Sequence, residues 1–591
     1  MSDMTYKWRM DDGGWGIPPQ TPSFFANSGN TQATLTWDVP ETTEIDGQVV
    51  CRAKGIKILR KTGGYPEHEN DGTVVVDSTN LTGSYTDTGL TNGTVYFYRA
   101  FAYSDHNVIN RDPAAEGSVT PSEAAILTVT FPSVMNGQTV TATKGNQTVT
   151  GTVSNGSVTL NLASTGTWNV CGRDFTVDTL GASYSLNIPI FAFHYSENDS
   201  SPASVSYPAG YTNSGYTDTF AMDLSTGVPS YGDWNPAGAN ADDVKMLYPK
   251  SCMLKFDGTV DYYLDEDDET KKEDGVTASD VANSSYSGNA MVEWGQDGVM
   301  RWKIVPDSDG KGFTFVITNA DVLDCQPWNH YDANGDITPH FYTPKYFGSN
   351  VSSKLRSISG TSGMVSQTRN TEVTYARANN VGSDIIWDTE VYADWLLLAM
   401  LCCLISKSTN SQAKFGSGRC ASSNSSAIAN GTMNGKGMFY GKSNQTEGVK
   451  VFGMENVWGN LWRGIRGLVT VAGSVVKVKL THGTQDGSEA SDYNFDGTGY
   501  LTRSAITGTS GGYTNAMDIN EKGLTPKTVS GSESTYYTDG CWFAANCYAL
   551  VGGSWDVAGR VGAFCVNLID AASATYAYYG SALSCKPLAG A

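Results

Sequence analysis

Residues 556–578 carry side chains that are suited to non-covalent recognition. Tyrosine offers a large contact area with few rotatable bonds, and short polar side chains adjust hydrogen bonds to a partner. Aromatic faces also stack on sugar rings, while aspartate and asparagine bind hydroxyl groups. We expect a binding surface here, and the alternative is a core hairpin with an ordinary polar face. The candidate site residues are Asp556, Arg560, Asn567, Asp570, Ser573, Thr575, Tyr576 and Tyr578.

Residue types that support catalysis or metal binding are scattered. No two of the six histidines stand at the helical spacing of a metal site. His330 and His340 flank residues 332–336, which have the character of a calcium loop but lack its final glutamate, so we predict a turn. The acidic run at residues 265–269 lacks the alternate spacing of calcium ligands and is expected to form a solvated loop. We therefore expect no catalytic residue, no bound metal and no cofactor.

Eleven cysteines are distributed along the chain without a regular framework. Their odd number argues against a disulfide scaffold. No pair has the two-residue gap of a zinc knuckle. We expect most of these cysteines to be small buried hydrophobic residues.

Length and charge restrict the class of protein. A chain of 591 residues is expected to form three or four domains. Its net charge of −21 and the lack of a basic stripe exclude nucleic acid as a partner. The longest apolar run, residues 395–405, is shorter than the roughly 20 residues that cross a bilayer, so we predict a buried helix and no membrane insertion. Residues 1–22 show no secretory signal, which predicts synthesis in a cytoplasm without classical export.

Strand and turn signals divide the chain into four parts. Alternating segments that place Trp37 on a second strand and Tyr96 near a tyrosine corner resemble a fibronectin type III domain. A smaller β unit with the same kind of alternation follows it. The predicted parts are an attachment arm at 1–20, a fibronectin type III-like domain at 21–121, an Ig-like β-sandwich spacer at 122–192, and a large C-terminal domain at 193–591.

Two segments rich in glycine and tryptophan stand about a hundred residues apart, Gly453–Trp462 and Gly552–Trp555. Together with the final strand that begins at Tyr579, they resemble the signature segments of the C-type-lectin-like fold of the formylglycine-generating-enzyme kind. The fold class is therefore expected to be multidomain and mainly β, with two N-terminal β-sandwiches and an α+β C-type-lectin-like domain. The tryptophans that match the scaffold signature, which we expect in the core, are Trp458, Trp462 and Trp555.

The enzymes of this family carry reactive cysteines just after the second segment. The resemblance places them at Val557 and Gly562, and neither residue supplies the thiolate that redox or copper chemistry needs. Cys541 and Cys547 lie nearby but precede the turn. An oxidase of the formylglycine-generating type is therefore disfavoured, and we expect that the chain is not an enzyme.

Bacteriophages use this fold as a receptor-binding platform, and in their variable proteins the stretch equivalent to residues 556–578 contacts the ligand. The resemblance implies a phage tail-fibre or tail-tip adhesin, which is made in the host cytoplasm and carried in the virion. Its expected partners are a host cell-surface receptor, glycan or protein, and other tail proteins bound through the N-terminal region. A homotrimer is expected from closed symmetry. A bacterial surface glycan-binding protein is the alternative. Retroelement diversification of the stretch stays open, because several positions are small or apolar: Val557, Ala558, Gly559, Ala571, Ala572 and Ala574.

Overall fold

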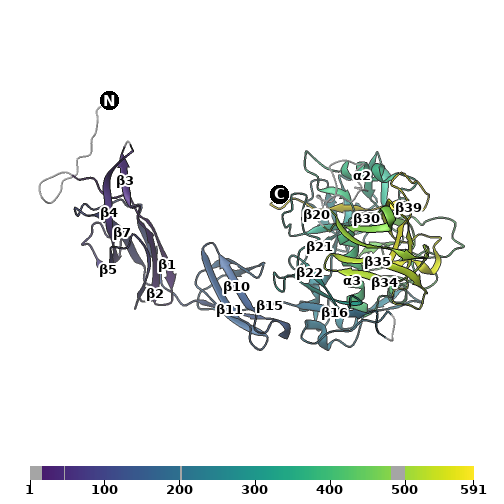
Figure 1. Cartoon of the computed structure of the whole chain (residues 1–591), viewed down its shortest axis with the longest axis horizontal. Helices are drawn as coiled ribbons and strands as arrows, with labels where there is room; N and C mark the ends of the chain where they lie inside the picture. The colour runs from purple at the N-terminus through teal and green to yellow at the C-terminus, as the bar shows by residue number, and fades with distance from the viewer. Residues whose placement is uncertain (1–15, 46, 200–202, 481–499, 591) are drawn as a thin grey trace, which may run out of the picture. The chain divides into compact units, whose positions relative to one another are not determined.

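The computed structural model describes residues 16–45, 47–199, 203–480 and 500–590. Most of the arm predicted at residues 1–20 therefore lies outside the described residues. The chain forms two compact units, and its regular structure is dominated by strands (Figure 1). The prediction of a multidomain, mainly β protein is confirmed. Unit 1 comprises residues 1–130, 136–170 and 174–186, and unit 2 comprises residues 131–135, 171–173 and 187–591.

The first part of unit 1 is a β-sandwich. Its strands are β1 (Ser23–Gly29), β2 (Gln32–Asp38), β3 (Thr42–Ile45), β4 (Gln48–Thr62), β5 (Thr73–Ser78), β6 (Thr82–Thr88), β7 (Tyr96–Ser104) and β8 (Glu116–Val119). One sheet has the order β1-β2-β6, and the other has the order β3-β4-β7-β8 with β5 beside β4. Alternate residues of both sheets, among them Leu35, Ile58 and Tyr98, share one core. The hydroxyl of Tyr96 accepts a hydrogen bond from the Thr91 backbone N–H at 3.1 Å, as the predicted tyrosine corner requires.

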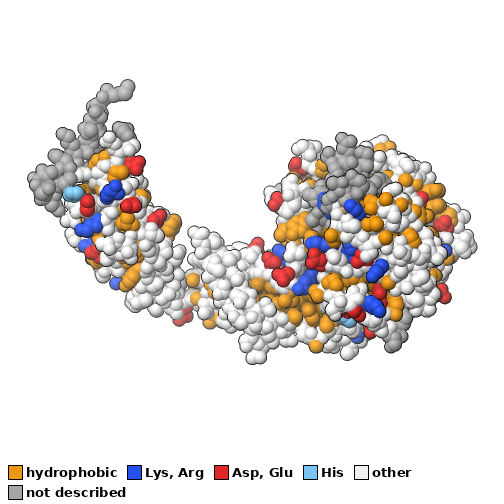
Figure 2. All heavy atoms as spheres, in the orientation of Figure 1, with side chains coloured by type: hydrophobic (Ala, Val, Ile, Leu, Met, Phe, Trp, Pro, Cys, Tyr) orange, Lys and Arg blue, Asp and Glu red, His pale blue; other side chains and the backbone are white. Residues whose placement is uncertain are grey.

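The second part of unit 1 is a smaller sandwich. Its strands are β9 (Ala125–Thr130), β10 (Thr139–Lys144), β11 (Gln147–Thr152), β12 (Ser157–Leu162), β13 (Gly166–Val170), β14 (Arg173–Val177) and β15 (Ser183–Asn187). The sheets have the orders β11-β10-β13-β14 and β12-β9-β15. Trp168 is fully buried, and its indole N–H donates to the Ser164 carbonyl at 2.9 Å. The visible face of this sandwich carries few charged side chains (Figure 2).

Unit 2 is built around two large sheets and a smaller one. Within the described residues, the first large sheet has six strands in the order β20 (Val260–Tyr263), β19 (Lys250–Lys255), β21 (Gly288–Trp294), β24 (Phe341–Pro344), β40 (Leu583–Cys585) and β27 (Trp387–Thr389). The second has the order β32 (Leu501–Ala505), β31 (Val475–Val478), β30 (Trp462–Val471), β37 (Cys547–Gly552), β38 (Gly562–Leu568), β36 (Gly540–Phe543), β34 (Gly512–Asn520), β35 (Gly523–Gly531) and β33 (Thr507–Gly508), with β39 (Tyr579–Ser581) beside β30. The smaller sheet has the order β16 (Ile190–Ser196), β23 (Gly312–Thr318) and β22 (Arg301–Pro306). The predicted boundary at residues 192 and 193 falls inside β16, which pairs with β23 of unit 2.

Short hairpins and helices complete the architecture. The paired short strands are β17 (Ala221–Asp223) with β18 (Val228–Ser230), β25 (Gly348–Val351) with β26 (Lys354–Ser357), and β28 (Lys450–Val451) with β29 (Met454–Glu455). The described α-helices are α1 (Ala241–Val244), α2 (Arg369–Arg377), α3 (Tyr392–Ser406) and α4 (Ser411–Phe415). The described 3-10 helices are η1 (Ser133–Met135), η2 (Thr212–Gly215), η3 (Gly232–Trp234), η4 (Lys245–Leu247), η5 (Ala472–Ser474) and η6 (Ala558–Arg560).

The predicted buried helix is α3, and every one of its residues is buried. A helix that is apolar on all sides needs neighbours around its whole circumference. Here β16, β30 and β38 pack against it. The helix ends at Lys407, whose left-handed backbone (φ 56°) stops the helical run. None of the helices in the described ranges combines the length and the apolar character needed to cross a bilayer.

The last strands of the chain connect the two large sheets. β39 runs parallel to β30, and β40 lies between β24 and β27. Directly after β40, Lys586 forms an ion pair with Asp394 at 3.1 Å, and both side chains are fully buried. Lys586 also donates to the Asn329 carbonyl at 2.8 Å. The chain end is thereby fixed to the first turn of α3.

The acidic run at residues 265–269 does not lie wholly in solvent. Glu269 is 2% exposed and forms ion pairs with Lys345 and, at 2.7 Å, with Lys450. The expectation of a solvated loop is therefore wrong at this residue, because two lysines distant in the sequence neutralise the buried carboxylate. The turn predicted between His330 and His340 is confirmed by the bonds from the Asn334 and Asp336 N–H groups to the Asp332 carboxylate.

All eleven cysteines lie in the described residues as free thiols, and all except Cys171 are buried. Burial raises the pKa of each of these buried thiols, for example that of Cys541 to about 12. The thiols are therefore neutral at physiological pH and act as apolar packing groups. This agrees with the prediction that most cysteines are buried hydrophobic residues.

Replacing Lys586 with methionine is expected to lower the free energy of unfolding of unit 2 by about 3–5 kcal/mol, because the Asp394 carboxylate stays buried without its cation. The matched control is Lys271→Met. It breaks the 3.2 Å pair with Asp268, whose partners are about 40% exposed, and should cost less than about 1 kcal/mol. Urea unfolding followed by tryptophan fluorescence measures both variants. If both variants lost the same free energy of unfolding, the buried pair would contribute no more to stability than the exposed pair, and the prediction would be wrong.

Candidate functional site

The predicted binding stretch, residues 556–578, divides into a buried centre and two accessible flanks. β38 forms the centre, and all seven of its residues are buried between β36 and β37. Asn567 lies on this strand at 5% exposure, and its side-chain oxygen accepts the Ile569 N–H at 2.9 Å. Asn567 therefore offers almost no surface to a partner, and the hairpin alternative describes this part of the stretch correctly. The flanks are residues 556–560 and 569–578.

The first flank is fixed to the scaffold mainly through backbone groups. The Trp555 N–H donates to the Asn460 carbonyl at 3.1 Å, and the Ala558 N–H donates to the Cys420 carbonyl at 2.7 Å. Ser554 is fully buried and donates to the Asp556 carboxylate at 2.5 Å. Asp556 itself is exposed. Trp458 and Trp462 are buried as expected, whereas Trp555 is only partly buried, so its assignment to the core is corrected.

The second flank presents a cluster of three tyrosines. The rings of Tyr576 and Tyr578 are stacked with centroids 5.2 Å apart and planes inclined by 9°. Tyr579 meets both rings edge-on, and its hydroxyl donates to the Asp570 carboxylate. Tyr576 is 44% exposed and Tyr578 is partly exposed, whereas Tyr579 is buried. Two parallel rings on a buried third ring form a firm aromatic platform at the surface.

Backbone hydrogen bonds hold this flank in place. The Trp462 N–H donates to the Tyr578 carbonyl at 2.9 Å, and the Ser366 N–H donates to the Tyr576 carbonyl at 3.1 Å. The Arg369 N–H, at the start of α2, donates to the Ala572 carbonyl at 3.0 Å. The loop is therefore ordered by its main chain, and the side chains of its exposed residues stay available. The exposed candidates of this flank are Ser573, Thr575 and Tyr576.

The structure brings most of the accessible candidates onto one face. Tyr578 and Val557, from opposite flanks, pack on the same buried cluster around Trp462, and Trp542 packs there with them. Burial raises the pKa of Tyr578, and the neighbouring Tyr576, Asp556 and Asp570 raise it further, which places both acids near the ring. We refer to the accessible residues of this face as the tyrosine face. It comprises Trp542, Asp556, Val557, Arg560, Asp570, Ser573, Thr575, Tyr576 and Tyr578.

Trp542 is the residue of this face that the sequence analysis missed. It is partly exposed at the end of β36, meets Trp462 edge-on at 5.6 Å, and lies beneath the Arg560 guanidinium. Its position just before the turn at residues 544–546 was the signal that could have found it. The strand pairing of β36 with β38, which brings it beside Arg560, is not visible in the sequence.

Gly562, where the sequence resemblance places the second reactive cysteine, has no room for a larger side chain. A Cβ atom on Gly562 would lie 2.5 Å from the Asp539 carboxylate oxygens and 2.6 Å from the Ser411 hydroxyl. Gly562 also has φ 145°, which other residues rarely adopt. A cysteine here would therefore require the carboxylate and its surroundings to move. Val557, the other position that the resemblance indicates, packs on the buried cluster around Trp462 as an apolar side chain.

No group of three or more His, Cys, Asp or Glu residues suited to a metal ion occurs in the described part of the chain. His330, which the sequence analysis considered, is a structural residue. Its ring nitrogens bond to the Met300 N–H at 3.0 Å and the Thr338 carbonyl at 2.9 Å. Burial lowers its pKa to about 3, so the imidazole is neutral. Both of its hydrogen-bonding positions are occupied by the backbone.

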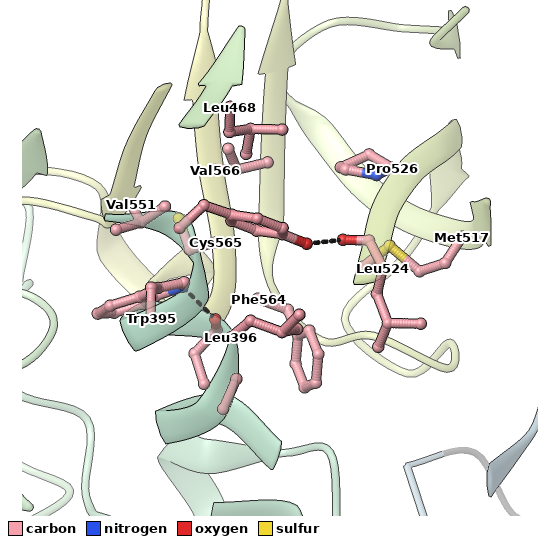
Figure 3. A pocket seen from close by; sticks show the side chains of 13 residues that line it. Trp395, Leu396, Leu468, Met517, Leu524, Pro526, Val551, Phe564, Cys565 and Val566 are labelled. Carbon is pink, nitrogen blue, oxygen red and sulfur yellow. Dashed lines mark hydrogen bonds between the residues drawn. The ribbon is translucent and has the colours of Figure 1, made fainter. Parts of the chain in front are cut away.

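A small cavity lies beneath the ten-stranded sheet, where α3 meets β34, β35 and β38 (Figure 3). Its volume is about 30 Å³, and apolar side chains such as Leu396, Leu468 and Phe564 line it. The polar groups at its edge are paired, since the Tyr392 hydroxyl donates to the Leu524 carbonyl and the Trp395 indole donates to the Ala563 carbonyl at 2.9 Å. Such a space has no polar partner for a ligand and is a gap in the packing.

Comparisons with known proteins give partial similarities. No family model and no curated protein matches the chain. An Fn3-like protein from Clostridium thermocellum is 24% identical over 18% of this chain and 97% of its own, with a TM-score of 0.13. The Major Tropism Determinant M1 variant is 11% identical over 68% of this chain and 83% of its own, with a TM-score of 0.21. BcpA, the major pilin subunit of Bacillus cereus, is 13% identical over 29% and 70%, with a TM-score of 0.12. Scores of this size carry no argument about function.

Asp539, which lies against Gly562, gives unit 2 a pH-dependent stability. Burial raises the pKa of this carboxyl from its ordinary value near 4 to about 8, although the Phe564 N–H donates to it at 2.7 Å. The unfolded chain ionises at the lower pH. The free energy of unfolding therefore falls as the pH rises from about 4 to about 8, by at most about 1.4 kcal/mol per pH unit.

Asp539→Asn is expected to abolish this contribution, because an amide stays neutral and still accepts the Phe564 N–H. The difference in unfolding free energy between the variant and the wild type should favour the variant increasingly from pH 4 to pH 8 and then stay constant. Urea unfolding across this pH range measures it. A difference that is independent of pH would show that Asp539 does not titrate in this range.

Proposed function

We propose that the chain is a phage tail adhesin that binds a receptor on the host cell surface through the tyrosine face of unit 2. The proposal combines two independent lines of support. The segments Gly453–Trp462 and Gly552–Trp555 resemble the signature of the C-type-lectin-like fold that phages use for receptor binding. The stretch that follows the second segment presents accessible aromatic and polar side chains on a fixed backbone.

The observation that carries the proposal is the stacked pair of Tyr576 and Tyr578. Exposed aromatic rings that adjoin one another form an apolar patch, and such patches mark contact sites. Their carbonyls bond to the scaffold, so little conformational freedom is lost when a receptor binds. The surrounding hydroxyl and carboxylate groups supply hydrogen bonds, as in other adaptable binding surfaces.

The proposed mechanism is non-covalent recognition without catalysis. Apolar Val557 and the crowded Gly562 occupy the positions of the reactive cysteines in the enzymes with a similar signature. The buried thiols nearby have a raised pKa, and thiol chemistry needs a thiolate. These features support recognition over oxidation.

We propose that unit 1 attaches the adhesin to other tail proteins and extends it, with the adhesin located in the virion. Its two sandwiches have ordinary apolar cores and no grouping of titratable residues suited to a metal in their described parts. In a homotrimer, weak contacts at several tyrosine faces would combine, which raises the apparent affinity by about 10²–10⁴ when all sites engage together.

Fluorescently labelled protein, incubated with a panel of bacterial strains, is expected to bind a subset of them. The double variant Tyr576→Ala/Tyr578→Ala should lose about ten-fold or more in affinity for those strains, because truncating a central aromatic anchor removes a dominant share of binding energy. Flow cytometry over a concentration series measures the affinity.

The matched control is Tyr85→Ala in unit 1, because Tyr85 is 43% exposed and Tyr576 is 44% exposed. The control should bind as the wild type does. If the wild type binds none of the strains, or if the double variant binds as strongly as the control, the proposed function of the tyrosine face is wrong.

A further inference from the structure

Among the described residues Arg560 is a cation without an anionic partner, although the chain carries a net charge of −21. Its Nη1 donates to the Gly511 carbonyl at 2.6 Å, and its guanidinium carbon lies 5.1 Å from the centroid of the Trp542 ring. The described residues place no carboxylate within ion-pair distance of it. In an acidic protein, an arginine that stays unpaired at the proposed binding surface needs an explanation.

The packing around Trp542 fixes the position of this guanidinium. A Cβ atom on Gly540 would lie 2.7 Å from the indole and 3.0 Å from the Cβ of Arg560, and one on Gly511 would lie 3.0 Å from the indole nitrogen. Trp462 supports the ring edge-on. Glycine at both positions thus lets the backbone hold the indole closely, and the indole in turn holds Arg560. The group is preorganised, which reduces the entropy lost on binding.

The groups around Arg560 are mainly hydrogen-bond donors. The guanidinium uses one of its five N–H groups on Gly511. The indole N–H of Trp542 and the hydroxyl of Tyr513 have no acceptor among the described residues, and both side chains are partly exposed. Two acids act on Tyr513: Glu533, which is solvent-exposed, and Asp539, which is buried and whose pKa burial raises to about 8. A corner with several free donors and one fixed cation is complementary to an anion.

We propose that Arg560 and Trp542 form an anion-binding corner of the tyrosine face, and that the receptor presents a carboxylate or a phosphate group to it. This inference rests on the proposed function of that face. The planar guanidinium can bind either group through two parallel hydrogen bonds, and the indole N–H, which has no acceptor among the described residues, is a further donor beside it. The net charge of −21 repels densely charged polymers such as nucleic acid, so the fitting ligand is a glycan in which acidic groups are isolated among neutral sugars.

Three monosaccharides with one skeleton test the corner directly: galacturonic acid, galactose 6-phosphate and galactose. Saturation-transfer NMR on the full chain is expected to show that at least one of the two acids binds about ten-fold more tightly than galactose, as a charge-assisted hydrogen bond predicts. A preference for galacturonic acid assigns a carboxylate, and a preference for galactose 6-phosphate assigns a phosphate.

Arg560→Gln should abolish the preference for the acids, and Arg560→Lys should retain part of it, because lysine keeps the charge but not the planar fork. The matched control is Lys522→Gln, which removes a cation that also lies over a tryptophan, 4.0 Å from the centroid of Trp328. The control should keep the wild-type preference. Equal binding of all three sugars by the wild type, or an unchanged preference in Arg560→Gln, overturns the proposal.

The same variants on host cells separate this proposal from the proposed function. If the wild type and Arg560→Gln bind cells equally well while Tyr576→Ala/Tyr578→Ala does not, the tyrosine face is the receptor site and the anion-binding corner is wrong. If no strain binds the wild type, the adhesin function is wrong, and the monosaccharide comparison alone decides whether the corner recognises anions.

Discussion

The buried ion pair between Lys586 and Asp394 is the contact on which the arrangement of unit 2 depends. The segment before Lys586 adds one strand to each of the two large sheets, and the pair then connects that segment to the first turn of α3. An acid in the first turn of a helix is also favoured by the helix dipole. Because α3 packs against β30 and β38, the position of the chain end determines how these strands are supported. The buried cluster beneath the tyrosine face includes residues of both strands, Trp462 and Cys565.

Further buried ion pairs join the two large sheets where β27 lies near β30. Glu390, just after β27, pairs with Arg463 of β30 at 2.9 Å, and Asp388 of β27 accepts from Arg466 of β30 and, at 2.9 Å, from Arg377 of α2. Burying such charges costs desolvation free energy that their attraction only partly offsets. The pairs of Glu390 with Arg463 and of Asp388 with Arg466, however, require one register of β27 against β30. We interpret these pairs as specifying the register of β27 against β30. Their contribution to the free energy of folding is expected to be small.

The sequence predicted those elements whose burial follows from a local pattern, either an alternation or an unbroken apolar run. The alternation around Trp37, the run that becomes β7 and the apolar segment that becomes α3 all carry their own signal. Glu269 carries no such signal, and Trp542 carries only its place before a turn, because the surroundings of both residues are made by residues distant in the chain. For the site, the tyrosines and Arg560 were predicted from residue type. Asn567 was misjudged because β38 is buried on both faces and therefore shows no polar-apolar alternation.

In the tyrosine face, the groups that hold the loop in place differ from the side chains that are exposed at its surface. The main chain of residues 572, 576 and 578 is bonded to α2, to the segment before it and to β30, and the buried Tyr579 side chain holds Asp570. The side chains of Ser573 and Thr575 make no such contact within the described structure. Substitution at these two positions therefore changes the exposed surface of the tyrosine face without removing one of the hydrogen bonds that order the loop. A scaffold of this kind can change its exposed side chains while its fold stays constant, which would suit the proposed recognition of a cell-surface receptor.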